Sequence, residues 1–256
     1  MYKLRLRYSK TGKAKYISHL DLMATMRRAL LRAGIKLQYS EGFNPHPYMS
    51  VALPLSVGCS SVCELMDFGT PVELLPDNIP SIVNTVLPEG IQVLEAYSSE
   101  RGFNDIAWIR ISGTLFYDAE ASGNLTENLT ERFASESIII RKKTKRGISD
   151  IDIAPLVKDV QFYSDGRGLE IPGGIINAET GKIEYGNWEL IDPSIYQRTP
   201  DDGIAITMAA LISAQNPSIN PGDLINAFNF DNSALMPAFS SFTRTAIYDG
   251  SLRVFR

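Results

Sequence analysis

The sequence contains few of the features on which most catalytic sites depend. Its 256 residues include two histidines and two cysteines, and they contain no Gly-rich phosphate loop, no G-x-G-x-x-G motif and no Ser-His-Asp order. No stretch approaches the roughly 18 consecutive apolar residues of a membrane span, and the first residues lack the apolar core of a signal peptide. These absences argue against nucleotide-dependent enzymes, triad hydrolases and membrane proteins, and they predict a cytoplasmic protein.

Metal and cluster ligands are also scarce. Cys59 and Cys63 have the spacing of the first two ligands of a radical SAM iron–sulfur cluster, but the third position holds Met66. Such a cluster needs three thiolates, so the chain cannot hold one alone. We therefore expect no cofactor and two reduced thiols. A metal is not expected either, because no known ligand spacing is formed by His19, Asp21, Glu41 and His46.

Positive charge is concentrated at the start of the chain. Residues 1–47 contain ten Lys and Arg against Asp21 and Glu41, a net charge of +8, whereas the remainder contains 15 Lys and Arg against 27 Asp and Glu, a net charge of −12. A second basic run, RKKTKR at 141–146, interrupts this acidic remainder. Such asymmetry is typical of a surface that faces a polyanion, although a charge run can also be only a solvated face.

The periodicity of apolar residues predicts the same order of elements twice. Each half reads as β-α-β-β-α-β, so we expect an α+β protein with two tandem, elaborated ferredoxin-like halves. The first half is 1–100 and the second 101–256, with a polar insertion from about 173 to 202. The expected strands cover 2–9, 35–40, 48–55, 63–70, 90–98, 106–118, 137–145, 151–163, 203–213 and 242–249, and the expected helices 18–34, 71–87, 124–135 and 220–230.

The first of these helices has the clearest signals. Ser18 is expected as its N-cap, Asp21 completes a capping box, and Gly34 ends it. At about 100° per residue the helix has an apolar stripe made of Leu22, Met23, Met26, Ala29, Leu30 and Ala33. The opposite polar stripe contains Asp21, Thr25, Arg28 and Arg32.

Both histidines lie close to this helix in the sequence. His19 is its first residue, and His46 stands between Pro45 and Pro47, whose fixed φ angles make the loop rigid. Each histidine also has a structural interpretation, as a helix anchor or a turn residue. In a β-α-β unit, the start of the helix and the loop after the next parallel strand reach the same edge of the sheet. We therefore predict one site lined by His19, Asp21, Asn44 and His46.

One long block of the sequence resembles a known bacterial family. KYISHLDLMATMRRALLRAGIKLQYSEGFNPHPYMSVALPLSVG is similar to the signature region of the radical SAM-linked, or radical SAM-associated, domain of unknown function. CELMDFGT, DIDIAPLVKDV and FTRTAIYD extend the resemblance over most of the chain. Members are encoded beside a radical SAM protein or fused to its end, so the resemblance implies such a protein as partner. The element order is also similar to tandem ferredoxin-like RNA-binding proteins, including CRISPR-repeat endoribonucleases, which implies RNA as the polyanion.

Four functions remain open at this point, and the last of them is a small-molecule site. The first is an RNA-binding accessory protein that works with a separate radical SAM enzyme in RNA modification or processing. The second is a metal-independent endoribonuclease, in which His19 or His46 is the base at a 2′-hydroxyl. The third is a protein-only scaffold for the radical SAM partner. For the first, we expect RNA contacts from Arg5, Arg7, Arg28, Arg32, Tyr39, Phe43, Asn44, His46, Tyr48, Arg141, Lys142, Lys143, Lys145 and Arg146.

Overall fold

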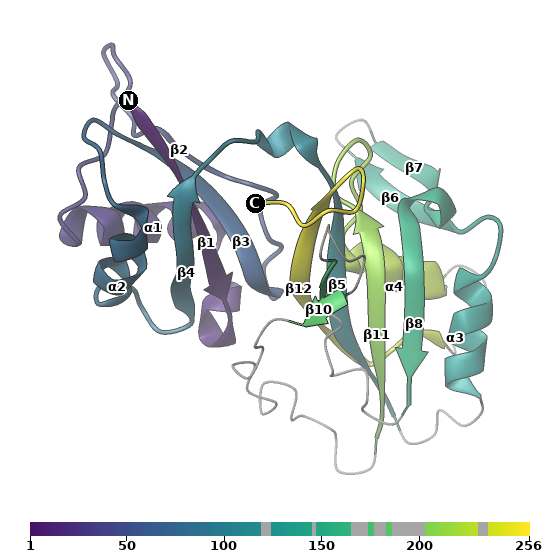
Figure 1. The fold of residues 1–256 in the computed structure, drawn as a ribbon. Coiled ribbons are helices and arrows are strands. Elements are labelled where there is room, and N and C mark those ends of the chain that lie inside the picture. Colours follow the sequence, from purple (N-terminus) through teal and green to yellow (C-terminus); the bar gives the residue numbers. More distant parts are fainter. Residues whose placement is uncertain (119–123, 145–146, 165–173, 177–182, 186–202, 230–234) are drawn as a thin grey trace. The chain divides into compact units, whose positions relative to one another are not determined.

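The computed structural model describes residues 1–118, 124–144, 147–164, 174–176, 183–185, 203–229 and 235–256. These residues form a mixed α+β fold with mostly antiparallel sheet and few helices (Figure 1). The chain divides into two compact units, Met1–Asp105 together with Arg256, and Ile106–Phe255. No helix in the described ranges is long and apolar enough to cross a membrane.

The first unit contains strands in the order β4-β1-β3-β2, and each neighbouring pair is antiparallel. Helices α1 and α2 cover one face of these strands, where Leu4, Leu6 and Tyr8 of β1 are buried in the common core. In chain order, with η for 3-10 turns, the elements are β1 (Tyr2–Lys10), η1 (Gly12–Tyr16), α1 (His19–Arg32), β2 (Met49–Val51), β3 (Ser60–Thr70), η2 (Pro76–Asn78), α2 (Ile79–Asn84), β4 (Ile91–Ser98) and η3 (Phe103–Asp105).

Both ends of α1 are formed by the residues that the sequence indicates. The hydroxyl of Ser18 accepts a hydrogen bond from the N–H of Asp21 (3.1 Å) and donates to its carboxylate (2.7 Å). At the other end, Gly34 takes φ +79, its N–H donates to Leu31, and the next N–H, of Ile35, donates to Leu30. This is a Schellman motif, which requires a left-handed residue where Gly34 stands. The predicted apolar stripe of the helix is confirmed, because its members are buried or half-buried in the core.

The predicted strand over 35–40 is wrong. Ile35 and Leu37 are buried and Lys36 is exposed, which is the alternation that suggested a strand. The backbone, however, forms no ladder: Gln38 donates one hydrogen bond to the carbonyl of Gly69 (2.8 Å), and Tyr39 forms an isolated bridge with Pro47. The next strand of the sheet is β2, which starts only at Met49.

The second unit contains strands in the order β12-β5-β11-β8, also antiparallel, with two separate hairpins, β6-β7 and β9-β10. Helix α3 packs on β8, and Phe133 makes ring contacts with Phe162 (5.9 Å) and Phe228 (5.7 Å). The elements are β5 (Ile106–Tyr117), α3 (Leu125–Phe133), β6 (Ile139–Thr144), β7 (Gly147–Asp152), η4 (Ala154–Leu156), β8 (Val157–Tyr163), β9 (Gly174–Ile176), β10 (Ile183–Tyr185), β11 (Ile204–Ser213), α4 (Pro221–Asn229) and β12 (Phe239–Asp249).

Two predictions for this unit need correction or qualification. The single strand expected over 151–163 is divided by η4, because Pro155 lies within that turn and supplies no backbone N–H for a ladder. The insertion expected at about 173–202 lies outside the described residues, apart from β9 and β10.

Candidate nucleic-acid interface

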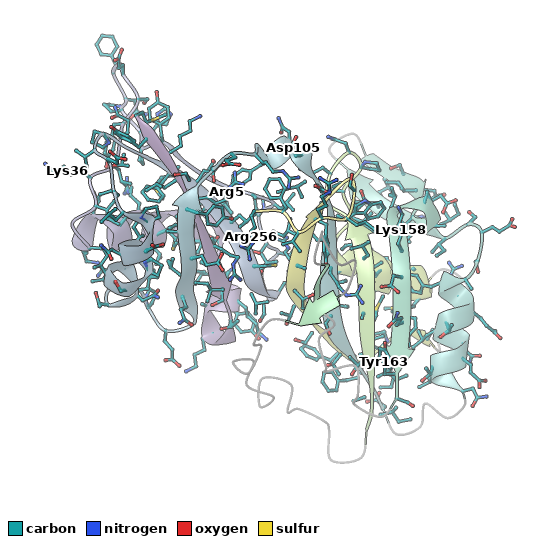
Figure 2. The ribbon with its side chains drawn as sticks, in the orientation of Figure 1. Arg5, Lys36, Asp105, Lys158, Tyr163 and Arg256 are labelled. Carbon is teal, nitrogen blue, oxygen red and sulfur yellow. The ribbon has the colours of Figure 1, made fainter. Side chains whose placement is uncertain are left out.

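The outer side of α1 carries a group of exposed cations. Arg27, Arg28 and Arg32 are exposed on the second half of the helix. Lys36, which is labelled in Figure 2, is exposed just after the helix. None of them forms an ion pair among the described residues; the guanidinium of Arg32 instead donates to the carbonyl of Val86 (3.0 Å). Four cations without acidic partners produce a local positive potential, which attracts phosphate.

The chain continues from these cations into a projecting loop, residues 40–47. Hydrogen bonds close its neck: the N–H of Ser40 donates to the carbonyl of His46 (2.9 Å), and the N–H of His46 donates to the Ser40 hydroxyl (3.1 Å). Within it, Gly42 has φ +115, and Phe43 has a relative exposure of 111%. Figure 1 shows this loop, between α1 and β2, projecting beside the N-terminus of the chain. An aromatic ring so exposed gains no packing energy in its own protein, which is typical of a contact residue.

The neck of the loop adds two more exposed aromatic side chains, Tyr39 and Tyr48. The N–H of Tyr48 donates to Gln38, and Gln38 donates to Gly69, which pairs with Lys3 near the start of β1. The loop is therefore attached at the end of the sheet where β1 begins. We define the α1–loop surface as Arg27, Arg28, Arg32, Lys36, Tyr39, Phe43, Asn44, His46 and Tyr48, all exposed.

His19 does not belong to this surface. The segment before it is attached at the other end of β1, where the Lys10 ammonium donates to the carbonyl of Ile17 (3.0 Å). From Lys3 to Lys10 a strand rises by about 23 Å. The predicted common site of His19 and His46 is therefore not formed. The prediction placed the loop after a strand over 35–40 that runs parallel to β1. The strand parallel to β1 is instead β2, since both are antiparallel to β3, and the loop precedes it.

His19 is half-buried at the start of α1. The Nδ1 atom of His19 is buried and has no hydrogen-bond partner among the described residues. Nearby, Lys10 is 1% exposed. Burial lowers the pKa of Lys10, and the negative charges of Glu64 and Cys59 partly oppose this effect. In the described ranges, no group of three or more His, Cys, Asp or Glu side chains is placed to hold a metal ion.

Arg5 and Arg7 point to the sheet face opposite the helices, where carboxylates of neighbouring strands bind them. Arg5 is fully buried and forms a bidentate ion pair with Asp67 (2.6 and 2.9 Å). Its guanidinium also donates to the carbonyl of Arg101 (2.8 Å) and lies 4.4 Å from the ring centre of Phe103. Arg7 pairs with Glu95 (2.8 Å), and this hydrogen bond lowers the pKa of Glu95. These two arginines, predicted to contact phosphate, are bound inside the first unit.

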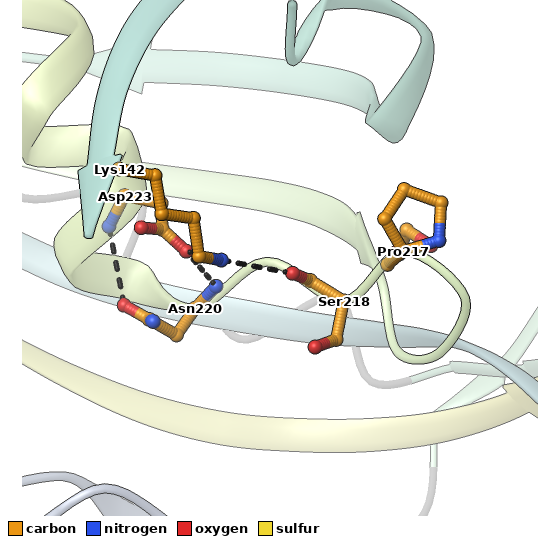
Figure 3. A network of polar contacts seen from close by, with 6 residues as sticks. Lys142, Pro217, Ser218, Asn220 and Asp223 are labelled. Atoms are coloured by element: carbon orange, nitrogen blue, oxygen red, sulfur yellow. Dashed lines mark hydrogen bonds and ion pairs between the residues drawn. The ribbon is translucent and has the colours of Figure 1, made fainter. Parts of the chain in front are cut away.

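The second basic run is only partly a surface feature. The ammonium of Lys142 on β6 bonds to the Asp223 carboxylate (2.7 Å) and to the Ser218 carbonyl (3.0 Å) (Figure 3). Asp223 and Asn220 cap α4 reciprocally, because the side chain of each accepts from the N–H of the other. Arg141 is 68% exposed and lies 3.6 Å from Asp150. Lys143 belongs to β6, and Lys145 and Arg146 lie outside the described residues.

Because Lys142 is bound by Asp223 and Arg141 is exposed, substitutions at these two adjacent positions should lower the free energy of unfolding by different amounts. Lys142→Met should lower the free energy of unfolding by about 1–2 kcal/mol, because it leaves the buried Asp223 carboxylate without its cation. Arg141→Met should change it by less than about 0.5 kcal/mol, since exposed ion pairs contribute little. Urea denaturation followed by tryptophan fluorescence measures both, because Trp108 lies on β5 of the second unit. Equal losses for the two variants would contradict the structural role of Lys142.

Sequence reasoning missed two members of the α1–loop surface, Arg27 and Lys36. Arg27 lies beside the polar stripe that was projected, and Lys36 lies in the segment that was expected to be a strand. The signal that would have found both is the absence of acidic residues between Asp21 and Glu41, an interval that contains four cations.

Comparison with known proteins identifies a family for this chain but assigns no activity to it. A family model described as "Uncharacterized protein conserved in bacteria (DUF2344)" matches residues 3–185. This range includes the whole α1–loop surface. No curated protein matches the chain.

Proposed function

The chain belongs to the DUF2344 family of uncharacterized bacterial proteins, and from its α1–loop surface we propose that it binds RNA through the first unit. The observation that carries this proposal is the continuity of exposed cations with a closed loop that presents Phe43 to solvent. Phosphates would contact Arg27, Arg28, Arg32 and Lys36. Unpaired bases would stack on exposed aromatic rings, as in other single-strand RNA interfaces.

The separation of the two histidines argues against cleavage by a pair of imidazoles, so the cleavage alternative depends on a single histidine as base. General acid–base cleavage of RNA by a histidine pair needs both imidazoles at one phosphate. His19 and His46 are attached at opposite ends of β1, so they do not form such a pair. Incubating labelled RNA with the protein in EDTA tests the alternative, since a product would indicate that the chain is an endoribonuclease.

We extend the proposal to the fold and the partner. The order β12-β5-β11-β8 of the second unit corresponds to β4-β1-β3-β2 of the first, and α3 and α4 occupy the chain positions of α1 and α2. This correspondence supports two tandem ferredoxin-like units. The sequence resemblance supports a cytoplasmic role beside a separate radical SAM enzyme, to which this protein would present RNA for modification or processing. Co-purification of that enzyme with the tagged chain, sensitive to ribonuclease, would test the partnership.

Phe43→Ala should weaken binding of single-stranded RNA about tenfold, because stacking of one base on an aromatic ring contributes about 1–3 kcal/mol. Fluorescence anisotropy of a labelled oligonucleotide measures the affinity. Tyr16→Ala is the matched control: Tyr16 is 61% exposed but belongs to η1, at the other end of β1. Equal effects of the two substitutions would show that Phe43 has no specific role.

A further inference from the structure

The contacts of His46 favour one tautomer of its imidazole. Nδ1 lies 3.3 Å from the carbonyl oxygen of Asn44 and 3.0 Å from the hydroxyl of Ser40. A carbonyl can only accept, so the contact with Asn44 requires a proton on Nδ1. The Ser40 hydroxyl already accepts from the N–H of His46 and has a second lone pair for Nδ1–H. In the neutral ring, this arrangement leaves the lone pair on Nε2.

Nε2 is then an acceptor on an exposed side chain. No described residue bonds to it, and His46 is exposed in the same closed loop as Phe43. Ser40 holds the main chain of His46 through two hydrogen bonds, and the Nδ1 contacts to Ser40 and Asn44 orient the ring, so the direction of the acceptor is set before any ligand arrives. An acceptor of fixed direction next to a stacking ring is suited to reading the edge of a base.

Building on the proposed RNA-binding function, we propose that His46 is a specificity residue that selects bases with an exocyclic amino group, and cytosine over uracil in particular. The N4 amino group of cytosine is a donor and complements the Nε2 lone pair. Uracil has a carbonyl oxygen at that position, so its lone pairs face those of Nε2. Its one N3–H donor lies between two carbonyl oxygens. The two pyrimidines are of the same size, so a difference between them reports the hydrogen bond rather than stacking area.

The test measures the affinities of oligocytidylate and oligouridylate, of equal length, for the full chain and for its His46→Phe variant. This substitution keeps an aromatic ring but removes the acceptor. The wild type should bind oligocytidylate about fivefold more tightly, the value of one hydrogen bond of about 1 kcal/mol. His46→Phe should bind both at the affinity of the wild type for oligouridylate, with the same salt dependence. Ser40→Ala should reduce the preference, because it removes one of the two bonds that orient Nδ1.

The tautomer of the His46 imidazole can be measured without RNA. With only two histidines in the chain, the imidazole nitrogen chemical shifts of His46 are assigned by comparison with His46→Phe. They should show Nδ1 protonated and Nε2 unprotonated in the neutral ring; the opposite tautomer would overturn the assignment. Equal affinity of the wild type for the two oligomers would also overturn the assignment of His46 as a specificity residue. A preference for oligocytidylate that persists in His46→Phe would overturn it as well. Failure of the wild type to bind either oligomer would instead overturn RNA binding itself, and the role of His46 with it.

Discussion

Arg28→Glu combined with Arg32→Glu should lower the affinity for RNA by about two orders of magnitude. Each arginine is exposed on the outer side of α1 and has no acidic partner among the described residues, so it is available to phosphate. Losing two charge-assisted contacts and adding two repulsive charges corresponds to about 3 kcal/mol. The log–log slope of affinity against salt should also become shallower by about 1.4, since each phosphate contact on a single strand contributes about 0.7.

A matched variant separates a local site from a general loss of positive charge. Lys13→Glu with Lys15→Glu changes the net charge of the chain by the same amount, but both lysines lie in η1 at the other end of β1. This variant should retain most of the affinity and the wild-type salt slope. The same loss in both variants would show that RNA senses only the overall charge of the first unit. A wild type whose binding does not depend on salt would contradict the phosphate interface altogether.

Arg5→Met should destabilise the first unit by about 3 kcal/mol, because removing one partner of a buried ion pair leaves the other without compensation. The Asp67 carboxylate would lose two hydrogen bonds, and the Arg101 carbonyl and the Phe103 ring would lose the guanidinium that holds them. Hydrogen exchange of peptides from β1 and β3 measures this unit separately. Fluorescence of Trp108 should change little, since this residue belongs to the second unit.

Arg7→Met is the control for this prediction. Arg7 stands on the same strand and also pairs with a carboxylate, but its side chain is 24% exposed and that of Glu95 is 36% exposed, against 0% and 26% for the Arg5 pair. A pair open to water contributes little, so the loss should be about 1 kcal/mol or less. Should Arg5→Met prove as mild as Arg7→Met, the buried pair would not be what holds residues 101–103 to the sheet.

Local signals of the sequence determined most of the elements. The caps of α1 at Ser18 and Gly34 and the capping of α4 by Asn220 depend on contacts within a few residues, and the alternation of β1 is a pattern within nine residues. Such contacts are set by periodicity, side-chain oxygens and the backbone freedom of glycine, all of which can be read without the fold. The strand predicted over 35–40 is not formed because alternating burial does not require a ladder. The side chains of Ile35 and Leu37 reach the core, while the backbone makes separate hydrogen bonds, at Gln38 to Gly69 and at Ser40 to His46, and an isolated bridge at Tyr39.

The residues that form the α1–loop surface could be predicted only in part from the sequence. The stretch from α1 to the FNPHP loop contained both the cations and the exposed aromatic residues, because these lie on consecutive segments and their solvation follows from helical phase and proline content. Which cations are available was decided by the tertiary structure. Arg5, Arg7 and Lys142 are bound by Asp67, Glu95 and Asp223, carboxylates distant in sequence that strand pairing and helix packing bring within 3 Å. The separation of His19 from His46 also depends on the tertiary structure. The strand parallel to β1 is β2, which starts after the loop, so the loop lies at the end of the sheet where β1 begins, whereas His19 follows the other end of β1.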